Sequence, residues 1–176
     1  NQVVIVTGAG RGLGRLYALE FAQRGAAVVV NDLGSSMHGE GADGSVADEV
    51  VEEIRRNGGR AMASHHSVAT PEGGEAIVRT AIEHFGRLDA VVSNAGIFGS
   101  ADFENLAHYA AAKAGIFGLA NVVAIEGEEY GIKSNSVLPF GFSRMVTETV
   151  GDADTAAQIP FLQIIDPKLV VPMVTF

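Results

Sequence analysis

The sequence contains no cysteine among its 176 residues. Without thiols the chain can form neither disulfide bonds nor cysteine-ligated metal sites, and the redox compartment is left undetermined. Any oxidation or reduction that the protein carries out would therefore depend on a bound cofactor. We expect no metal site.

Basic residues are also scarce. Twelve lysines and arginines stand against 21 aspartates and glutamates, which gives a net charge of -9. A phosphate backbone or an anionic membrane surface would be repelled by this charge. The most apolar stretch, residues 110–125, is interrupted by Lys113 and Asn121 and falls short of a membrane span. No signal peptide is visible. We expect a soluble, cytoplasmic protein that binds neither nucleic acid nor a membrane.

The length and the hydrophobic content of 47% suit one domain over residues 1–176. Apolar runs alternate with stretches whose apolar residues recur at helical spacing, which predicts a doubly wound, mostly parallel α/β sheet. The predicted strands are Val3–Val6, Ala26–Val30, Arg60–Ser64, Leu88–Ser93 and Ile132–Leu138. The predicted helices cover residues 13–21, 46–56, 71–85 and 107–130. The pattern weakens beyond Pro139.

Glycines cluster where the first predicted strand turns into the first predicted helix. Glycine lets a ligand approach the backbone closely, so free N–H groups at the helix start can bind phosphate oxygens. The spacing is Gly8-x-x-x-Gly12-x-Gly14 rather than the general dinucleotide fingerprint G-x-G-x-x-G. Glycine-rich turns also occur as plain tight connections. The candidate cofactor-binding residues of this turn are Gly8, Arg11, Gly12, Leu13 and Gly14.

Asp32 follows the second predicted strand. An acid at this place can accept hydrogen bonds from the adenosine ribose hydroxyls of NAD, whereas the 2′-phosphate of NADP would meet a like charge. Its position therefore favours NAD over NADP. Arg11 and Arg15 keep NADP as a minor alternative. Without the glycine turn, an exposed strand-end aspartate would be the better interpretation.

Tyr109 and Lys113 lie four residues apart on a predicted helix and therefore share one face. A cation beside a phenol stabilises the phenolate, which could then exchange a proton with an alcohol. Lysine can also hydrogen-bond ribose hydroxyls, so one residue could support both the proton transfer and the cofactor. Taken alone, a tyrosine and a lysine at this spacing are more often an ordinary surface pair.

The glycine turn, Asp32, Asn94-Ala95-Gly96 and Tyr109-x-x-x-Lys113, in this order, resemble the short-chain dehydrogenase/reductase family. The resemblance implies a Rossmann-like fold and a hydride passed between a nicotinamide and an alcohol or carbonyl carbon. It assigns acid-base catalysis to Tyr109, supported by Lys113. The further cofactor-binding residues that it implies are Asp32, Ser67, Val68, Asn94, Ala95, Gly96, Tyr109, Lys113, Pro139 and Ser143.

Within that family, several segments are similar to the (3R)-hydroxyacyl-CoA dehydrogenase units of peroxisomal multifunctional β-oxidation enzymes and their bacterial relatives. These segments include Asn31-Asp32-Leu-Gly, Ala-Ile-Glu126-Gly and Ser143-Arg144-Met145. The likeness runs over nearly the whole chain up to Val150. It implies fatty acid metabolism, an alcohol, ketone or acyl-CoA substrate, and a homodimer or homotetramer.

The chain departs from the family where a catalytic serine is expected on the strand before the tyrosine helix. Too few residues separate Asn94 from Tyr109 to form the expected helix and strand, so one helix-strand unit is missing between Leu106 and Ala107. Either residues are omitted at this junction, which we favour, or the protein has lost the unit. The C-terminus is also expected to be incomplete.

His66 stands where the family has an aspartate near the adenine, and we interpret it as a half-buried histidine at a strand end. Three functions compete for the chain as a whole. The first is an NAD-dependent oxidoreductase, with a 3-hydroxyacyl-CoA as a candidate substrate. The second is a non-catalytic NAD-binding protein that lacks the serine. The third is a structural subunit that associates through residues 107–130.

Overall fold

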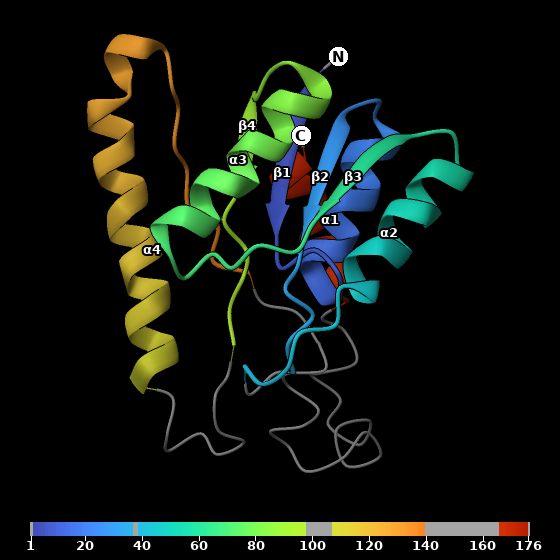
Figure 1. Ribbon diagram of the computed structural model, residues 1–176. Helices are drawn as coiled ribbons and strands as arrows, with labels where there is room; N and C mark the ends of the chain where they lie inside the picture. Colours follow the sequence, from blue (N-terminus) through green and yellow to red (C-terminus); the bar gives the residue numbers. More distant parts are fainter. Residues whose placement is uncertain (1, 37–38, 98–106, 140–165, 176) are drawn as a thin grey trace.

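The computed structural model describes residues 2–36, 39–97, 107–139 and 166–175. Its centre is a parallel sheet in the order β3-β2-β1-β4 (Figure 1). The strands are β1 (Val3–Thr7), β2 (Ala27–Asn31), β3 (Arg60–Ser64) and β4 (Ala90–Val92). The predicted parallel α/β architecture is confirmed.

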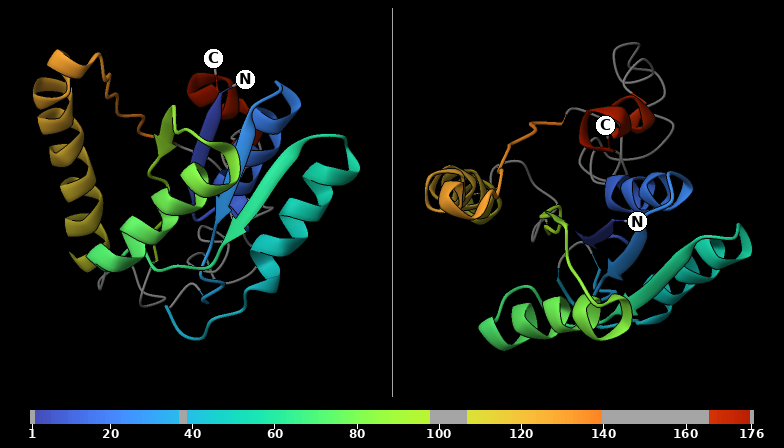
Figure 2. Two further views of the ribbon diagram at one scale, coloured as in Figure 1. Left: turned by 45° about the horizontal axis from the view of Figure 1, so that its top comes forward. Right: turned by 90° about the horizontal axis from the view of Figure 1, so that it is seen from above.

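Helices cover both faces of this sheet (Figure 2). One face packs against α1 (Gly12–Gln23), α2 (Ser45–Arg56) and the short α8 (Val171–Thr175), whereas α3 (Pro71–Phe85) covers the other. The connections that carry α1 and α2 therefore lie opposite the one that carries α3. This arrangement is the doubly wound topology that the alternating sequence pattern predicts.

Strand β1 shows why the central strands are apolar at every position. Val4 and Val6 pack into the core beneath α1 and α2, while Val3 and Ile5 pack into the core beneath α3. All four side chains are at most 2% exposed. A strand buried on both faces needs no polar alternation, so it appears in sequence as a continuous β-branched run.

The edge of the sheet differs from the prediction. No strand forms over Ile132–Leu138, which lies in the described part of the chain as an extended segment without strand pairing. In addition, β4 is shorter than the predicted Leu88–Ser93, and Val91 is 52% exposed. A strand needs a neighbour, and within the described residues the sheet ends at β4. A sheet that ends at β4 is what we expect if the next helix-strand unit is missing.

Helix α4 (Ala107–Glu126) stands beyond the β4 edge and is followed by a 3-10 turn, η2 (Glu128–Tyr130) (Figure 1). From the sequence, residues 110–125 were expected to fall short of a membrane span because Lys113 and Asn121 interrupt them. With its 20 residues, the helix nevertheless is long and apolar enough to cross a membrane by length and composition alone. None of its residues is buried.

The last described elements are η3 (Pro167–Leu169) and α8, which pack against α1. Val170 and Val171 are buried there, in the same core as the β1 and β2 side chains that face α1 and α2. The apolar residues from Leu169 onward, where the sequence pattern was weak, therefore form short helices. The apolar piece over residues 159–165 lies outside the described residues.

Asp89 ties the start of β4 to the start of β1. Its Oδ2 accepts a hydrogen bond from the Val3 N–H at 2.8 Å, and its carboxylate pairs with Arg87 at 2.5 Å. The Arg87 hydrogen bond, followed by the Val3 N–H, lowers the pKa of the Asp89 carboxyl. A carboxyl whose pKa is depressed by folding stabilises the fold above its unfolded pKa and loses this contribution as the pH falls through its folded pKa.

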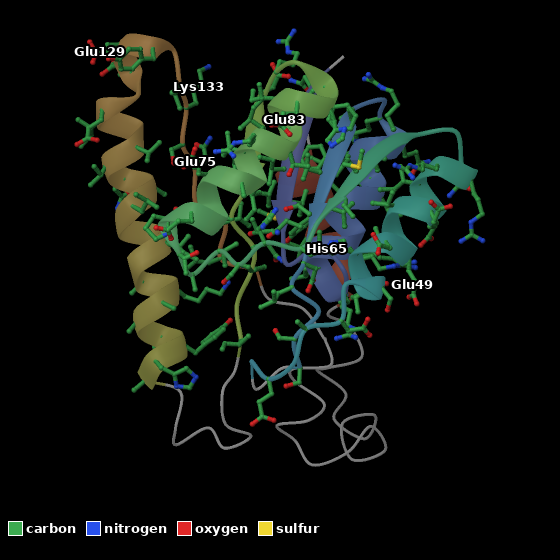
Figure 3. All side chains as sticks on the ribbon, in the orientation of Figure 1. Glu49, His65, Glu75, Glu83, Glu129 and Lys133 are labelled. Atoms are coloured by element: carbon green, nitrogen blue, oxygen red, sulfur yellow. The ribbon has the colours of Figure 1, made fainter. Side chains whose placement is uncertain are left out.

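We expect Asp89→Asn to lower the free energy of unfolding at pH 7, because the amide keeps an acceptor for Val3 but loses the ion pair with Arg87. The difference from wild type should shrink as the pH falls below about 4, where aspartate in the unfolded chain begins to protonate. Urea unfolding at pH 7 and pH 3 measures both effects. The exposed Glu83 of α3 provides the control Glu83→Gln, which should change neither value (Figure 3). An Asp89→Asn deficit that persists unchanged at pH 3 would contradict this account.

Candidate functional site

The candidate site lies along the edge of the sheet where all four parallel strands end. Gly8 follows β1, Asp32 follows β2, His66 follows β3 and Asn94 follows β4. Ligands of open parallel sheets bind outside the carboxyl ends of the strands. The topology thus brings together candidates that are far apart in the sequence.

The first helix begins in the glycine turn without a side-chain cap. Its N-cap residue, Arg11, makes no capping hydrogen bond, and its first turn carries no acidic residue. By contrast, α3 is capped by the Thr70 hydroxyl, which accepts a hydrogen bond from the Gly73 N–H at 3.1 Å. The N–H groups at the start of α1 and the positive end of its dipole are therefore available to an anion.

Three glycines of the turn are required for different structural reasons. A Cβ atom at Gly14 would overlap the Gly8 carbonyl oxygen, and one at Gly8 would lie 2.8 Å from the Ala95 Cα. Gly12 has a φ of +55°, and a Cβ there would face open space. Gly8 and Gly14 thus allow backbone segments to pack closely, whereas Gly12 keeps the backbone open on the side where a phosphate would approach.

Asp32 is held by two backbone donors. Its Oδ2 accepts from the Gly10 N–H and its Oδ1 from the Gly34 N–H, both at 2.8 Å. The carboxylate therefore links the glycine turn to the loop that follows β2. A carboxylate offers about four lone-pair positions, so two are left for ribose hydroxyls.

Thr7 joins the glycine turn to the segment after β4. Its hydroxyl oxygen accepts from the backbone N–H groups of Asn94 and Ala95, both at 3.1 Å. The Asn94 side chain returns a hydrogen bond to the Thr7 carbonyl at 3.0 Å and another to the Gly8 carbonyl at 3.2 Å. Sequence reasoning did not select Thr7 as a site residue. The signal in the sequence that could have identified Thr7 is its place as the one polar residue at the end of an apolar strand.

Lys113 connects α4 to the same segment. Its Nζ donates to the carbonyl oxygens of Asn94 and Ala95, both at 3.0 Å, and lies 5.8 Å from the centre of the Tyr109 ring. Burial lowers the pKa of the Lys113 ammonium. A Cβ atom at Gly96 would lie 2.9 Å from Lys113 Nζ and 3.6 Å from Tyr109 Cε2, so glycine leaves room for both side chains. The structure therefore places the tyrosine-lysine pair beside the β4 end.

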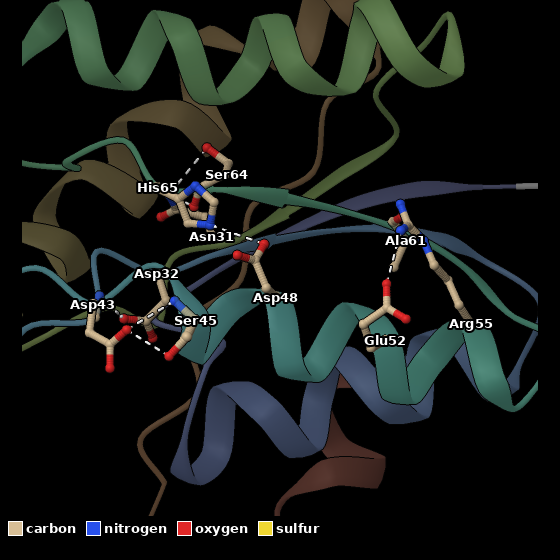
Figure 4. A network of polar contacts seen from close by, with 11 residues as sticks. Asn31, Asp32, Asp43, Ser45, Asp48, Glu52, Arg55, Ala61, Ser64 and His65 are labelled. Carbon is tan, nitrogen blue, oxygen red and sulfur yellow. Dashed lines mark hydrogen bonds and ion pairs between the residues drawn. The ribbon is translucent and has the colours of Figure 1, made fainter.

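Asn31, which is only 2% exposed, holds the segment after β3. Its side-chain amide donates to the carbonyls of Ser64 at 3.0 Å and His66 at 2.9 Å (Figure 4). Sequence reasoning missed this residue as well. His66 itself is exposed, not half-buried as predicted. The Asn31 amide thus fixes the backbone next to the predicted adenine contacts.

The roles of Ser67, Val68 and Pro139 stay predictions. The Ser67 hydroxyl accepts from the Ala69 N–H at 3.2 Å within its own turn, and Val68 is 52% exposed. Pro139 is exposed at the end of the extended segment. Ser143 and the junction between Leu106 and Ala107 lie outside the described residues.

Parallel strands wrapped by helices on both faces, with a glycine turn opening the first helix, define an α/β protein of the Rossmann type. The tyrosine-lysine pair lies at the same sheet edge. The model of the short chain dehydrogenase family matches residues 2–108, which is more than half of the chain. The protein belongs to this family, whose members are oxidoreductases.

Individual relatives agree with this assignment. The chain is 40% identical to the mouse peroxisomal multifunctional enzyme type 2 over 224 residues, covering 99% of this chain and 29% of the mouse protein. It is 36% identical to a short-chain type dehydrogenase/reductase of Mycobacterium tuberculosis over 226 residues, covering 100% of this chain and 77% of that protein. The chain thus spans less than a third of the mouse enzyme.

Solved structures share the fold. A short chain dehydrogenase from Mycobacterium avium superimposes with a TM-score of 0.78 at 33% identity, covering 99% of this chain and 76% of that one. Carveol dehydrogenase from the same organism, solved in complex with NAD, has a TM-score of 0.86 at 21% identity, covering 100% and 90%. The second likeness concerns the fold alone.

The alignments with relatives also bear on the missing unit. They extend over 224 and 226 residues, although this chain has only 176. The relatives therefore contain residues without a counterpart here. This excess fits the helix-strand unit that the sequence predicts to be missing and the sheet that ends at β4 among the described residues.

Proposed function

We propose that the protein is an NAD-dependent oxidoreductase that interconverts a hydroxyl and a carbonyl group. The observation that carries this proposal is the Lys113 ammonium, which bonds the backbone beside the glycine turn and lies against Tyr109. One side chain thereby connects the candidate cofactor site with the candidate acid-base group.

The residues present fit a dinucleotide. The uncapped start of α1 offers N–H groups for the pyrophosphate, and the open side of Gly12 gives it access. Asp32 has acceptor capacity for the adenosine ribose, and its negative charge opposes a 2′-phosphate. These features support NAD rather than NADP. When bound, NAD supplies the nicotinamide carbon that accepts the hydride.

The protein's own groups would handle the proton. Tyr109 would take the hydroxyl proton of the substrate as the hydride leaves the carbon that carries this hydroxyl. In the reverse direction Tyr109 would return the proton. The Lys113 ammonium has three donors, two of which bond the Asn94 and Ala95 carbonyls. The third is available to a ribose hydroxyl. Lys113 would thus orient the cofactor and stabilise the Tyr109 phenolate.

A 3-hydroxyacyl-CoA is our proposed substrate. The support comes from the relatives, which include multifunctional enzymes of peroxisomes and hydratase-dehydrogenase-epimerases of fungi. The chain spans only part of these proteins, so the likeness concerns one of their activities. We also propose a homodimer or homotetramer built through α4, where Phe117, Leu119 and Ile125 are at least 50% exposed. Light scattering of the purified protein would refute this assembly if it gave the monomer mass.

The proposed reaction can be followed by NADH absorbance at 340 nm. With NAD and (3R)-hydroxybutyryl-CoA, we expect NADH to form, and with NADP we expect a much lower kcat/KM. The enantiomeric (3S) substrate and a simple secondary alcohol serve as comparisons that separate a thioester preference from a general alcohol activity. No NADH with any of these substrates, despite calorimetric binding of NAD, would contradict the proposed enzyme.

A second candidate function is an NAD-binding protein without turnover. It is favoured by the length difference from the relatives, because the family's serine belongs to the unit that is missing between Leu106 and Ala107. An intact-mass measurement of the natural protein decides between an omitted and a lost segment. A mass that matches 176 residues, together with NAD binding and no turnover, would establish this second function.

A further inference from the structure

The segment that follows β3 lies where the base of a bound dinucleotide would extend. The start of α1 offers its N–H groups to the pyrophosphate, and Asp32 at the end of β2 offers acceptors to the adenosine ribose. In the sheet order β3-β2-β1-β4, the strand beyond β2 is β3. A base that is attached to this ribose and directed away from the pyrophosphate therefore reaches residues 65–68, directly after β3.

The two histidines that open this segment contribute little to its order. The His66 side chain is exposed. The His65 ring approaches the start of α2, where its Nε2 lies 3.2 Å from Asp48 Oδ1, but these two side chains are 46% and 58% exposed. A contact as open to water as this one restrains the chain only weakly. The segment therefore depends on partners that are buried.

Asn31 is the buried partner. Its side-chain nitrogen donates to the Ser64 carbonyl at 3.0 Å and to the His66 carbonyl at 2.9 Å, and the residue is only 2% exposed (Figure 4). The two acceptors are two residues apart, so the chain between them is held at both ends. Because hydrogen bonds shielded from water are stronger than exposed ones, the Asn31 amide restrains the segment more than the contact between His65 and Asp48 does.

The backbone around Asn31 holds the neighbouring parts of the site. The Asn31 carbonyl accepts from the Ala9 N–H of the glycine turn at 3.0 Å, and the Asp32 N–H donates to the Ser64 carbonyl, also at 3.0 Å. Asn31 thus bonds the glycine turn through its backbone and the segment after β3 through its side chain. The places of the pyrophosphate and of the base are therefore fixed relative to each other through one residue.

Helix α3 contacts the same segment independently of Asn31. A Cβ atom at Gly73, in the first turn of α3, would overlap the Ser67 carbonyl oxygen. A Cβ atom at the next residue, Gly74, would meet nothing within 4 Å. The same substitution at two adjacent glycines can therefore either displace the segment after β3 or leave it in place.

We propose that Asn31 is a positioning residue for the adenine half of the cofactor. It holds the backbone at Ser64 and His66 so that the residues that follow, up to the half-exposed Val68, form the surface on which the adenine lies. The inference rests on the proposed binding of NAD. Asn31 is itself buried, so it acts through this segment and does not touch the cofactor.

The test compares the Kd for NADH with the Kd for reduced nicotinamide mononucleotide, which lacks the adenosine half. Both are followed by the fluorescence of the reduced nicotinamide. In Asn31→Ala we expect the NADH Kd to rise about tenfold, because one hydrogen bond contributes up to a factor of this order. The mononucleotide Kd should stay within about twofold of wild type, since this ligand does not reach residues 65–68. A general loss of folded protein would instead raise both Kd values by the same factor.

Gly73→Ala displaces the same segment from the side of α3 and leaves Asn31 intact, so it gives the answer if Asn31→Ala does not fold in urea unfolding experiments. We expect it too to raise the NADH Kd severalfold and to leave the mononucleotide Kd unchanged. Gly74→Ala is the matched control and should change neither value.

The inference is overturned if the folded variants change neither Kd, or if they raise both by the same factor. A wild-type protein that binds NADH without turnover removes the proposed enzyme activity, and the inference is then decided by the same two Kd values. A wild-type protein that binds no NADH removes the proposed cofactor site, and the inference fails with it.

Discussion

Tyr109→Phe is expected to lower kcat for NADH formation by about 10²- to 10⁴-fold, the usual contribution of a positioned acid-base group. The substitution keeps the aromatic ring over which the Lys113 ammonium lies, and it removes only the hydroxyl. The Kd for NAD should therefore stay within about threefold of wild type. Stopped-flow absorbance at 340 nm gives the rate, and calorimetry gives the affinity.

Tyr130→Phe is the appropriate control for this variant. Tyr130 lies in η2, beyond the end of the same helix, and is 74% exposed. The control should retain the wild-type kcat. If Tyr109→Phe retains full turnover, Tyr109 is not the acid-base group. If its loss of activity is matched by an equal loss in NAD affinity, its role is in binding and not in proton transfer.

Gly14→Ala is expected to weaken nucleotide binding strongly. The added Cβ would overlap the Gly8 carbonyl oxygen and come within 2.6 Å of the Asn94 side-chain nitrogen. Relief requires the glycine turn to move, which changes the direction of the N–H groups at the start of α1. We expect the Kd for NAD to rise at least tenfold, and the fold to lose about 1–3 kcal/mol, the usual cost of overpacking. Calorimetry and urea unfolding separate the two effects.

Gly74→Ala provides the contrast, because a Cβ atom at this position in α3 would meet nothing within 4 Å. Alanine costs less than glycine within a helix, so the variant should be more stable by about 0.5–1 kcal/mol. Its NAD affinity should equal that of wild type. A Gly14→Ala protein that binds NAD normally would show that close packing of the turn against Gly8 and Asn94 is not required for the site.

The elements that the sequence predicts best are those with strong local signals. The buried strands β1 and β2 follow from continuous β-branched runs, and α3 follows from Pro71 at its start and Gly86 at its end, where the φ is +78°. Tyr109 and Lys113 follow from helical spacing. In each case the residues that specify the feature are neighbours in the chain, so periodicity and capping are sufficient.

Features that depend on distant partners were not predicted. Thr7 meets Asn94 and Ala95 across 87 and 88 residues, and Asn31 reaches the Ser64 and His66 carbonyls across 33 and 35 residues. The sequence neighbours of Thr7 and Asn31 do not indicate such contacts. The extended segment Ile132–Leu138 illustrates the opposite error. Its composition suits a strand, but a strand forms only where a neighbour pairs with it.

The exposed β4 strand has a practical consequence for handling this protein. Its Ala90 and Val91 side chains are exposed, and the sheet ends there among the described residues. An uncovered strand edge offers N–H and C=O groups that can pair with another polypeptide, and apolar side chains beside it promote aggregation. A polypeptide of these 176 residues alone should thus form turbid, light-scattering suspensions at high concentration, whereas a version carrying the relatives' extra residues should stay clear.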